Sequence, residues 1–184
     1  HLLLLQLPSD RAPIQARMTE LALPRRAFLS TSSLPPERAL LMCNLGLARA
    51  PREGATVLDP YCGSGGVLLA AAALGAETVG SDLDWRMVSD NRWPIAIPVS
   101  PDRPERGVER VRMRDNFVEA GLPEPRALLT LDVGADDAAA RLLQANGGRP
   151  YDALVCDPPS GRRAFQGGAG GWSGALTFKA AAAA

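Results

Sequence analysis

The sequence predicts an α/β fold, with a mostly parallel sheet that carries helices on both faces. Four short apolar segments, 55–59, 77–82, 127–131 and 151–156, have the length and composition of buried strands. Helix-forming stretches separate them, and strands that alternate with helices favour parallel pairing through right-handed crossovers. Because the sequence has no internal repeat, we expect one layered domain.

Five helices are expected around these strands. Pro35 and Pro36 suit the first turn of a helix, because proline is tolerated where no intrahelical N–H bond is needed. Gly75 follows an alanine-rich stretch and suits a left-handed helix cap. The expected helices are 35–48, 67–74, 84–92, 115–120 and 136–144.

One segment interrupts the alternation. Prolines at 94, 98, 101 and 104 interleave with charged side chains, which excludes a regular core element there. We therefore expect 93–112 to be an insertion loop on the surface. The expected division of the chain is an N-terminal extension or linker over 1–25, the folded domain over 26–165 and a Gly/Ala-rich tail over 166–184.

The composition is that of one globular domain. The 184 residues are 46% hydrophobic and 22% charged, values typical of a soluble chain with a single core. Twenty basic side chains balance twenty acidic ones, so an RNA partner would be held locally or by another module. The leucine run at 2–5 is far below the roughly 20 residues of a membrane span, and no membrane association is expected.

Cysteine usage indicates a reducing compartment and no metal site. Cys43, Cys62 and Cys156 are too few for a disulfide framework, and the sequence has no CxxC pair or His/Cys cluster. The cytoplasm is the expected location. Because the chain begins with His1 and ends in alanines at 180–184, we expect it to be a fragment of a longer protein.

The glycine-rich turn after the first strand is the first candidate for ligand binding. In open parallel sheets, ligands bind beyond the carboxyl ends of the strands, where the chain order reverses. Gly63, Gly65 and Gly66 would let the backbone approach a ligand closely, but the Gly-Lys of a phosphate-binding P-loop is missing. Asp59 opens the turn and would repel a pyrophosphate. Its carboxylate suits a cationic amino group, such as that of S-adenosylmethionine.

Two further strand-end aspartates fit a nucleoside. Asp82 ends the second strand, 19 residues after Gly63, and its carboxylate can accept hydrogen bonds from ribose hydroxyls, in either an NAD or an S-adenosylmethionine site. Asp132 ends the third strand and could accept from an adenine amine. Either residue could also be a solvated aspartate at a strand end.

The turn after the fourth strand carries the candidate chemistry. It reads Asp157-Pro158-Pro159-Ser160. A base amine that donates to the Asp157 carboxylate and to the Pro158 carbonyl would have its lone pair exposed for in-line attack on a sulfonium methyl group. Positioning and electrostatic alignment would supply most of the acceleration, and consecutive prolines fix the backbone. The alternative is an ordinary strand-ending turn.

Taken together, these motifs resemble those of the tRNA guanosine-10 N2-methyltransferase family, over about 26–163. Bacterial ribosomal-RNA guanine-N2 methylases share the same core pattern. The matching stretches are Ser30–Leu34, Arg38–Asn44, Leu58–Gly65, Gly80–Asp84, Asn116-Phe117 and Cys156–Pro159.

The resemblance implies a Rossmann-like class I methyltransferase fold that uses S-adenosylmethionine to methylate the exocyclic N2 amine of a guanine, in tRNA or another structured RNA. It also implies an N-terminal RNA-binding module, commonly a THUMP domain, cytoplasmic action and, in some members, a small activating partner protein. The implied cofactor-binding residues are Thr31, Ser32 and Ser33 at the methionine end, Asp59, Pro60, Tyr61, Cys62, Gly63, Ser64 and Gly65 around the amino acid moiety, Asp82 and Leu83 at the ribose, and Asp132 at the adenine. The implied catalytic turn is Asp157, Pro158, Pro159 and Ser160.

The chain departs from the family pattern in two places. Ser160 stands where the family has a tyrosine, so the aromatic face that would stack on a guanine is missing. The family sheet has seven strands and only four are readable here, so we expect a domain incomplete at its C-terminus, with weak or no catalysis by this stretch alone. Besides a ribosomal-RNA methyltransferase, the alternatives are a catalytically inactive scaffold and an NAD-dependent oxidoreductase, which Asp59 disfavours.

Overall fold

The predicted parallel sheet is present in the structure, a computed structural model that describes residues 14–30, 33–47, 54–91, 93–96 and 108–158. Four parallel strands lie in the order β5-β2-β1-β6. Val57 at the centre pairs with Thr78 on one side and Ala153 on the other. The strands are β1 (Thr56–Asp59), β2 (Glu77–Asp82), β5 (Ala127–Thr130) and β6 (Ala153–Leu154).

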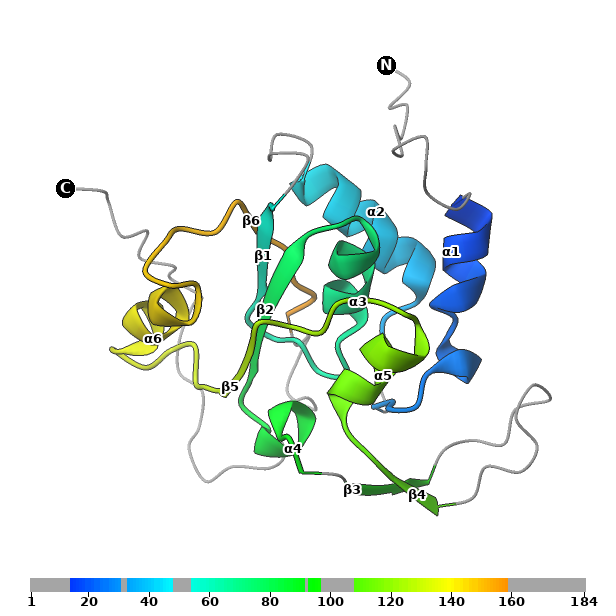
Figure 1. Ribbon diagram of the computed structural model, residues 1–184. Coiled ribbons are helices and arrows are strands. Elements are labelled where there is room, and N and C mark those ends of the chain that lie inside the picture. Colours follow the sequence, from blue (N-terminus) through cyan, green and yellow to red (C-terminus); the bar gives the residue numbers. More distant parts are fainter. Residues whose placement is uncertain (1–13, 31–32, 48–53, 92, 97–107, 159–184) are drawn as a thin grey trace.

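Helices cover both faces of this sheet, as predicted. Figure 1 shows α2, α3 and α5 on one side of the strands and α6 on the other. The helix bounds are α2 (Pro36–Gly46), α3 (Gly66–Ala73), α4 (Trp85–Val88), α5 (Met113–Glu119) and α6 (Ala138–Ala145). The α/β layering therefore follows from the alternation of apolar segments in the sequence.

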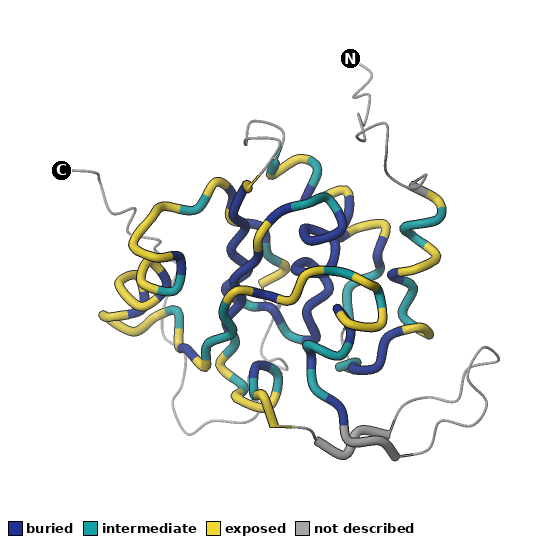
Figure 2. Tube along the Cα trace, in the orientation of Figure 1, coloured by how far each residue is buried: buried dark blue, intermediate teal, exposed yellow. Residues whose placement is uncertain are grey.

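Each face has its own apolar core. Because successive side chains of a strand point to opposite faces, Val57 packs into the larger cluster with α2, α3 and α5, and Leu58 packs into the smaller one with α6. Every residue of α3 is buried, whereas α6 buries only Ala138 and Leu142. Figure 2 shows this difference as a dark centre and a largely exposed α6.

The fourth strand is shorter than expected. Only Ala153–Leu154 of the predicted 151–156 forms the ladder. On either side of it, Asp152 N donates to Thr56 O and Val155 N donates to Leu58 O, each at 3.0 Å. The chain thus stays beside β1 up to the predicted catalytic turn.

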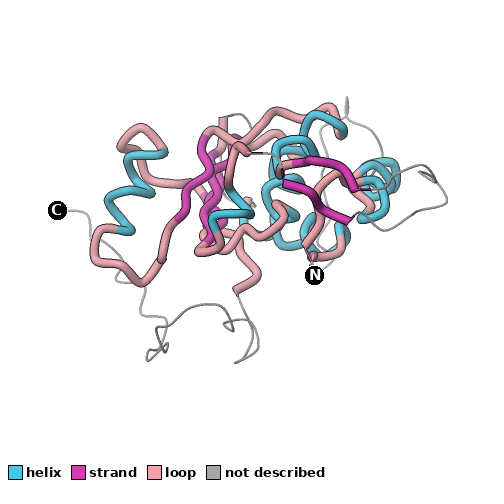
Figure 3. Tube along the Cα trace, turned by 90° about the horizontal axis from the view of Figure 1, so that it is seen from below, coloured by secondary structure: helices cyan, strands magenta, loops and turns pink. Residues whose placement is uncertain are grey.

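The insertion is more regular than the sequence suggested. Its two ends form β3 (Trp93–Ala96) and β4 (Val108–Val111), an antiparallel pair that is separate from the main sheet. Figure 3 shows this pair apart from the central strands. The expectation of a loop throughout 93–112 was wrong because both strands of a two-stranded sheet are edge strands, where a residue such as Pro94 is tolerated.

Before the domain proper, the chain also forms regular structure. Helix α1 (Ile14–Glu20) and the short 3-10 helix η1 (Leu23–Arg25) lie within the stretch expected as an extension or linker. Leu21 is buried in the larger core, and Met18 packs against it. Among the helices that the structure describes, none has the length and apolar character to cross a membrane.

The contact of α3 with β2 depends on Gly80. A Cβ there would lie 2.6 Å from Leu68 Cδ1, 3.0 Å from Cys62 Sγ and 3.1 Å from Leu128 Cδ2. We predict that Gly80→Ala lowers the free energy of unfolding by about 1–3 kcal/mol, because overpacking a tight contact displaces its neighbours. Urea denaturation measures this loss.

Gly134→Ala is the matched control for this substitution. Its Cβ would meet only Asp132 Oδ1 within 4 Å, at 3.2 Å, and that atom belongs to an exposed side chain. The control should change the free energy of unfolding by no more than about 0.5 kcal/mol. Equal losses in the two variants would contradict the packing argument.

Candidate functional site

The described residues of the predicted site gather at one edge of the sheet, beyond the carboxyl ends of the strands. The chain order reverses between β1 and β6, which is where ligands bind in sheets of this kind. Asp59 and Asp82 are the last residues of β1 and β2. Asp132 and Asp157 follow shortly after β5 and β6. The sheet therefore brings together four carboxylates that are far apart in the sequence.

The glycine-rich turn between β1 and α3 is tied to β2 next to it. Cys62 N donates to Ser81 O at 2.9 Å, and Ser81 Oγ donates to Pro60 O at 3.1 Å. Gly63 and Gly65 have φ of +49° and +82°, values that other residues rarely adopt. A Cβ on Gly63 would meet nothing within 4 Å. This side of the turn is therefore open enough for a ligand.

Asp82 holds the same turn through its side chain. Asp82 Oδ2 accepts from Gly63 N and Asp82 Oδ1 accepts from Asp84 N, both at 2.8 Å. Burial raises the pKa of Asp82; the hydrogen bonds from Asp84 N and Gly63 N oppose this shift, and the charge of Asp84 adds to it. Each carboxylate oxygen keeps a further lone pair. Asp82 can accept hydrogen bonds from a ligand while it holds the loop.

Asp59 lies beneath the turn and is 1% exposed. Its Oδ1 accepts from Tyr61 N at 3.0 Å. Burial raises its pKa to about 8; the bond from Tyr61 N opposes this shift, and the charges of Asp82 and Asp157 add to it. The carboxyl is thus mostly protonated at neutral pH. Its contact with a cationic ligand stays a prediction.

The segment before α2 lies against the turn through paired serines. Ser33 Oγ and Ser64 Oγ are 2.8 Å apart. Ser33 Oγ donates to Ser30 O at 3.0 Å, so Ser64 is the donor between the two hydroxyls. The structure therefore brings Ser33 to the predicted cofactor loop. Thr31 and Ser32, predicted with it, lie outside the described residues.

The remaining predicted residues lie at the rim of the site. Asp132 is exposed, and its Oδ1 accepts from Gly134 N at 2.9 Å. Leu83 is 62% exposed. Asp157 and Pro158 are exposed at the end of the described chain, and Pro159 and Ser160 lie outside it. The predicted catalytic carboxylate is accessible, and the rest of its turn is untested.

No cysteine has the character of a nucleophile. Burial raises the pKa of Cys156 to about 11, with the charges of Asp59 and Asp157 adding to the shift. Burial also raises the pKa of Cys43 to about 12 and that of Cys62 well above its usual range. Because the thiolate is the reactive form, the site offers no activated thiol. In the described part of the chain, no group of three His, Cys, Asp or Glu side chains could hold a metal ion.

Sequence reasoning gave no role to two buried polar side chains near the turn. Arg26 is 4% exposed; its Nε donates to Leu21 O at 3.1 Å, and its Nη1 has no hydrogen-bond partner among the described residues. Burial lowers its pKa to about 10. Asn116 is 2% exposed and bonds to both Phe28 and Ser64. The sequence did hold a signal for Asn116, because this polar residue lies on the buried side of α5 together with Met113 and Phe117.

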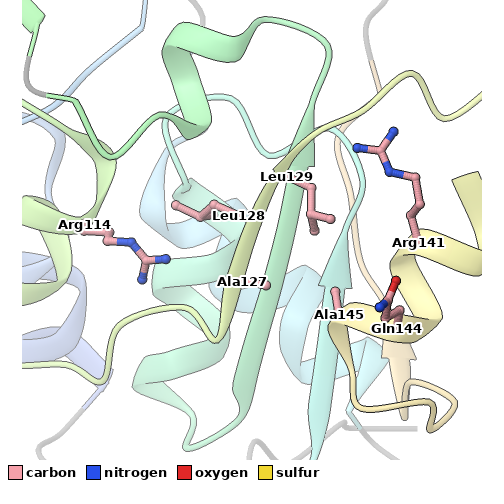
Figure 4. A pocket seen from close by; sticks show the side chains of 7 residues that line it. All are labelled: Arg114, Ala127, Leu128, Leu129, Arg141, Gln144 and Ala145. Atoms are coloured by element: carbon pink, nitrogen blue, oxygen red, sulfur yellow. The ribbon is translucent and has the colours of Figure 1, made fainter.

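A hollow lies along β5, at the opposite edge of the four-stranded sheet from β6 (Figure 4). Its two cationic side chains already have partners, since Arg114 donates to Pro125 O at 2.8 Å and Arg141 to Thr130 O at 3.1 Å. We therefore place the candidate site at the β1–β6 edge. The hollow is lined by Arg114, Ala127, Leu128, Leu129, Arg141, Gln144 and Ala145.

Comparison with known proteins gives a consistent result. Residues 24–173 match the family described as the RMKL-like methyltransferase domain. Over 68 residues the chain is 43% identical to the tRNA (guanine(10)-N2)-dimethyltransferase of Methanothermobacter thermautotrophicus, covering 37% of this chain and 19% of that protein. Over 139 residues it is 30% identical to the tRNA (guanine(10)-N(2))-methyltransferase TRMT11 of Dictyostelium discoideum, covering 76% of this chain and 22% of that protein.

The human TRMT11 is likewise 30% identical over 139 residues, which are 27% of its length. The chain thus spans about a fifth to a quarter of the length of these relatives. Their names confirm the resemblance to the tRNA guanosine-10 N2-methyltransferases. With the parallel sheet and the glycine-rich turn in place, the match over 24–173 establishes that the chain belongs to the RMKL-like methyltransferase domain family.

Proposed function

We propose that this chain forms the cofactor-binding and catalytic core of an S-adenosylmethionine-dependent RNA methyltransferase that modifies the exocyclic N2 amine of a guanine in tRNA. The observation that carries the proposal is the arrangement at the β1–β6 edge. A glycine turn held by Asp82 lies on one side of this edge, and Asp157 follows β6 on the other. The names of the relatives supply the RNA and the acceptor atom.

The described residues fit S-adenosylmethionine. Asp82 retains lone pairs for ribose hydroxyls, and the open side of Gly63 leaves room for a ligand near the backbone. Asp82 lies at this edge, and Asp59 can release its buried proton when a cation binds, so the edge favours a cation over a pyrophosphate. When bound, this cofactor supplies a methyl group activated by a sulfonium. Asp59 to Gly65 would hold its amino acid moiety, and Asp132 would lie at its adenine.

Asp157 and Pro158 would orient the acceptor amine. Both residues are exposed, and the bond from Val155 N to Leu58 O fixes the chain just before them. An amine that donates to a carboxylate and to a carbonyl has its lone pair directed away from both, so orientation is the main contribution of these groups.

RNA binding by the whole protein would depend on more than this domain. Twenty basic side chains balance twenty acidic ones, so the chain lacks the net positive charge that drives nonspecific RNA affinity. Following the family resemblance, the proposal also includes an N-terminal RNA-binding module, a small activating partner protein and a cytoplasmic location. Each would be tested in the full-length protein.

Substitutions at two strand-end aspartates should separate chemistry from cofactor binding. In the full-length protein, we predict that Asp157→Ala slows methyl transfer to unmodified tRNA at least about 100-fold, because the amine loses a charged acceptor. Its dissociation constant for S-adenosylmethionine should change less than about threefold. In contrast, Asp82→Ala should weaken cofactor binding at least about tenfold, since it removes a charged acceptor and loosens the turn. Radiolabelled methyl transfer and calorimetry measure the two effects.

The exposed Asp136→Ala is the control for both substitutions, since Asp136 lies beyond the strand ends in the loop before α6. It should leave the transfer rate and the cofactor affinity unchanged. A wild-type transfer rate in Asp157→Ala would rule out the proposed role of this carboxylate.

The buried carboxyl of Asp59 predicts a pH-dependent stability. Its pKa is about 8 in the folded protein and about 3.9 in an unfolded chain. Between these values the folded state holds a proton that the unfolded state has released, so the free energy of unfolding falls as the pH rises from about 4 to about 8.

Asp59→Asn should flatten this pH profile. An amide oxygen can still accept from Tyr61 N, and the side chain no longer titrates. At pH 8 the variant should be at least about 1 kcal/mol more stable than the wild type, as measured by urea denaturation at several pH values. Parallel profiles for the two proteins would show that Asp59 is not the group responsible.

A further inference from the structure

One side chain outside the strand ends joins two parts of the candidate site. Asn116 lies in α5 and is 2% exposed. Its Oδ1 accepts from Phe28 N at 2.7 Å, and its Nδ2 donates to Phe28 O at 2.8 Å. The same Nδ2 lies 3.3 Å from Ser64 O, to which it also donates. One buried amide therefore satisfies both backbone groups of Phe28 and reaches the glycine-rich turn.

The segment around Phe28 depends on such side-chain bonds. Between described residues, the backbone of 27–30 and 33–34 makes no backbone–backbone hydrogen bond. Its described hydrogen bonds to other elements come from Asn116 and from Ser64, and Ser30 and Ser33 bond to each other within the segment. Because buried N–H and C=O groups need partners, the position of this segment is set by α5 and by the turn.

Helix α5 also packs against the turn directly. A Cβ on Gly65 would lie 2.9 Å from both Cγ and Sδ of Met113, one turn before Asn116 in the same helix. The bond from Asn116 to Ser64 O is thus made beside a close van der Waals contact. Two neighbouring side chains of α5 fix the turn at adjacent residues.

We propose that Asn116 is a positioning residue that sets cofactor affinity by holding Phe28–Ser30 and Ser33 against the glycine-rich turn. This inference rests on the proposed function, because the turn and Ser33 belong to the predicted S-adenosylmethionine site. Asn116 itself is buried and acts through Phe28 and Ser64. Loss of the amide would leave Phe28 N, Phe28 O and Ser64 O without this partner, and the segment would move relative to the turn.

The chain offers a close match for a control. Asn146 is 0% exposed and follows α6; its Nδ2 donates to Arg149 O at 2.8 Å and to Pro150 O at 3.0 Å. It precedes β6, so it lies at the amino end of the sheet, away from the site. Asn116→Ala and Asn146→Ala each remove a buried amide with two or three backbone partners. Both variants should lose stability, but only Asn116→Ala should lose affinity for the cofactor.

The first measurement is calorimetric titration of S-adenosylmethionine into the purified wild type and both variants, below their melting temperatures. We expect Asn116→Ala to raise the dissociation constant about tenfold or more, and Asn146→Ala to change it less than about twofold.

If Asn116→Ala does not fold, Asn116→Asp is the alternative variant. A carboxyl so buried is expected to stay protonated, so it can keep both bonds to Phe28 and lose the one to Ser64. Its dissociation constant should rise about threefold.

The second measurement is hydrogen exchange of the ligand-free proteins. In Asn116→Ala, amides of 27–30 and of 63–66 should lose protection together, while those of β2 and β5 stay protected. If the wild type binds S-adenosylmethionine and neither Asn116 variant binds it more weakly, the inference is overturned and the proposed function stands. If the wild type does not bind it, the proposed function fails. Unchanged exchange in both segments would overturn the coupling by Asn116 independently of any ligand.

Discussion

The hydrogen bonds between the glycine-rich turn and β2 are the interaction on which the rest of the site depends. Gly63 N donates to Asp82 Oδ2, and Cys62 N donates to Ser81 O. These bonds require β2 to lie in parallel register beside β1, with Gly80 opposite Asp59. They also require φ values that glycine supplies. Without them the turn would have no fixed relation to the aspartates at the strand ends.

The same arrangement explains why an acidic edge is compatible with a stable fold. Asp59 is buried near Asp82 and Asp157. Its raised pKa means that the carboxyl stays protonated in the absence of a cationic ligand. Asp82 is only partly buried, and it gains two backbone N–H donors. One carboxyl is thus neutralised by a proton and the other is stabilised by hydrogen bonds. The edge keeps its preference for a cationic ligand at a moderate cost in stability.

The fold and the strand-end residues could be predicted because they follow from local patterns. Apolar runs predicted β1, β2 and β5 to within about one residue, and an aspartate at or just after the end of each strand lies at the predicted edge. The contacts of Asn116 with Phe28 span 88 residues, and no periodicity reports such a pairing. The burial of Asp59 likewise depends on tertiary packing around the end of β1, which local sequence patterns do not report. Strands β3 and β4 were missed because prolines exclude core strands but permit edge strands.

The proposed function requires that this edge binds S-adenosylmethionine through the turn and Asp82. The most direct measurement is calorimetric titration of the protein with S-adenosylmethionine and, in parallel, with NAD. We predict binding of S-adenosylmethionine and none of NAD, because the acidic edge favours a cation and disfavours a pyrophosphate. Binding of NAD, or of both ligands with equal affinity, would show that the edge does not select a cationic ligand.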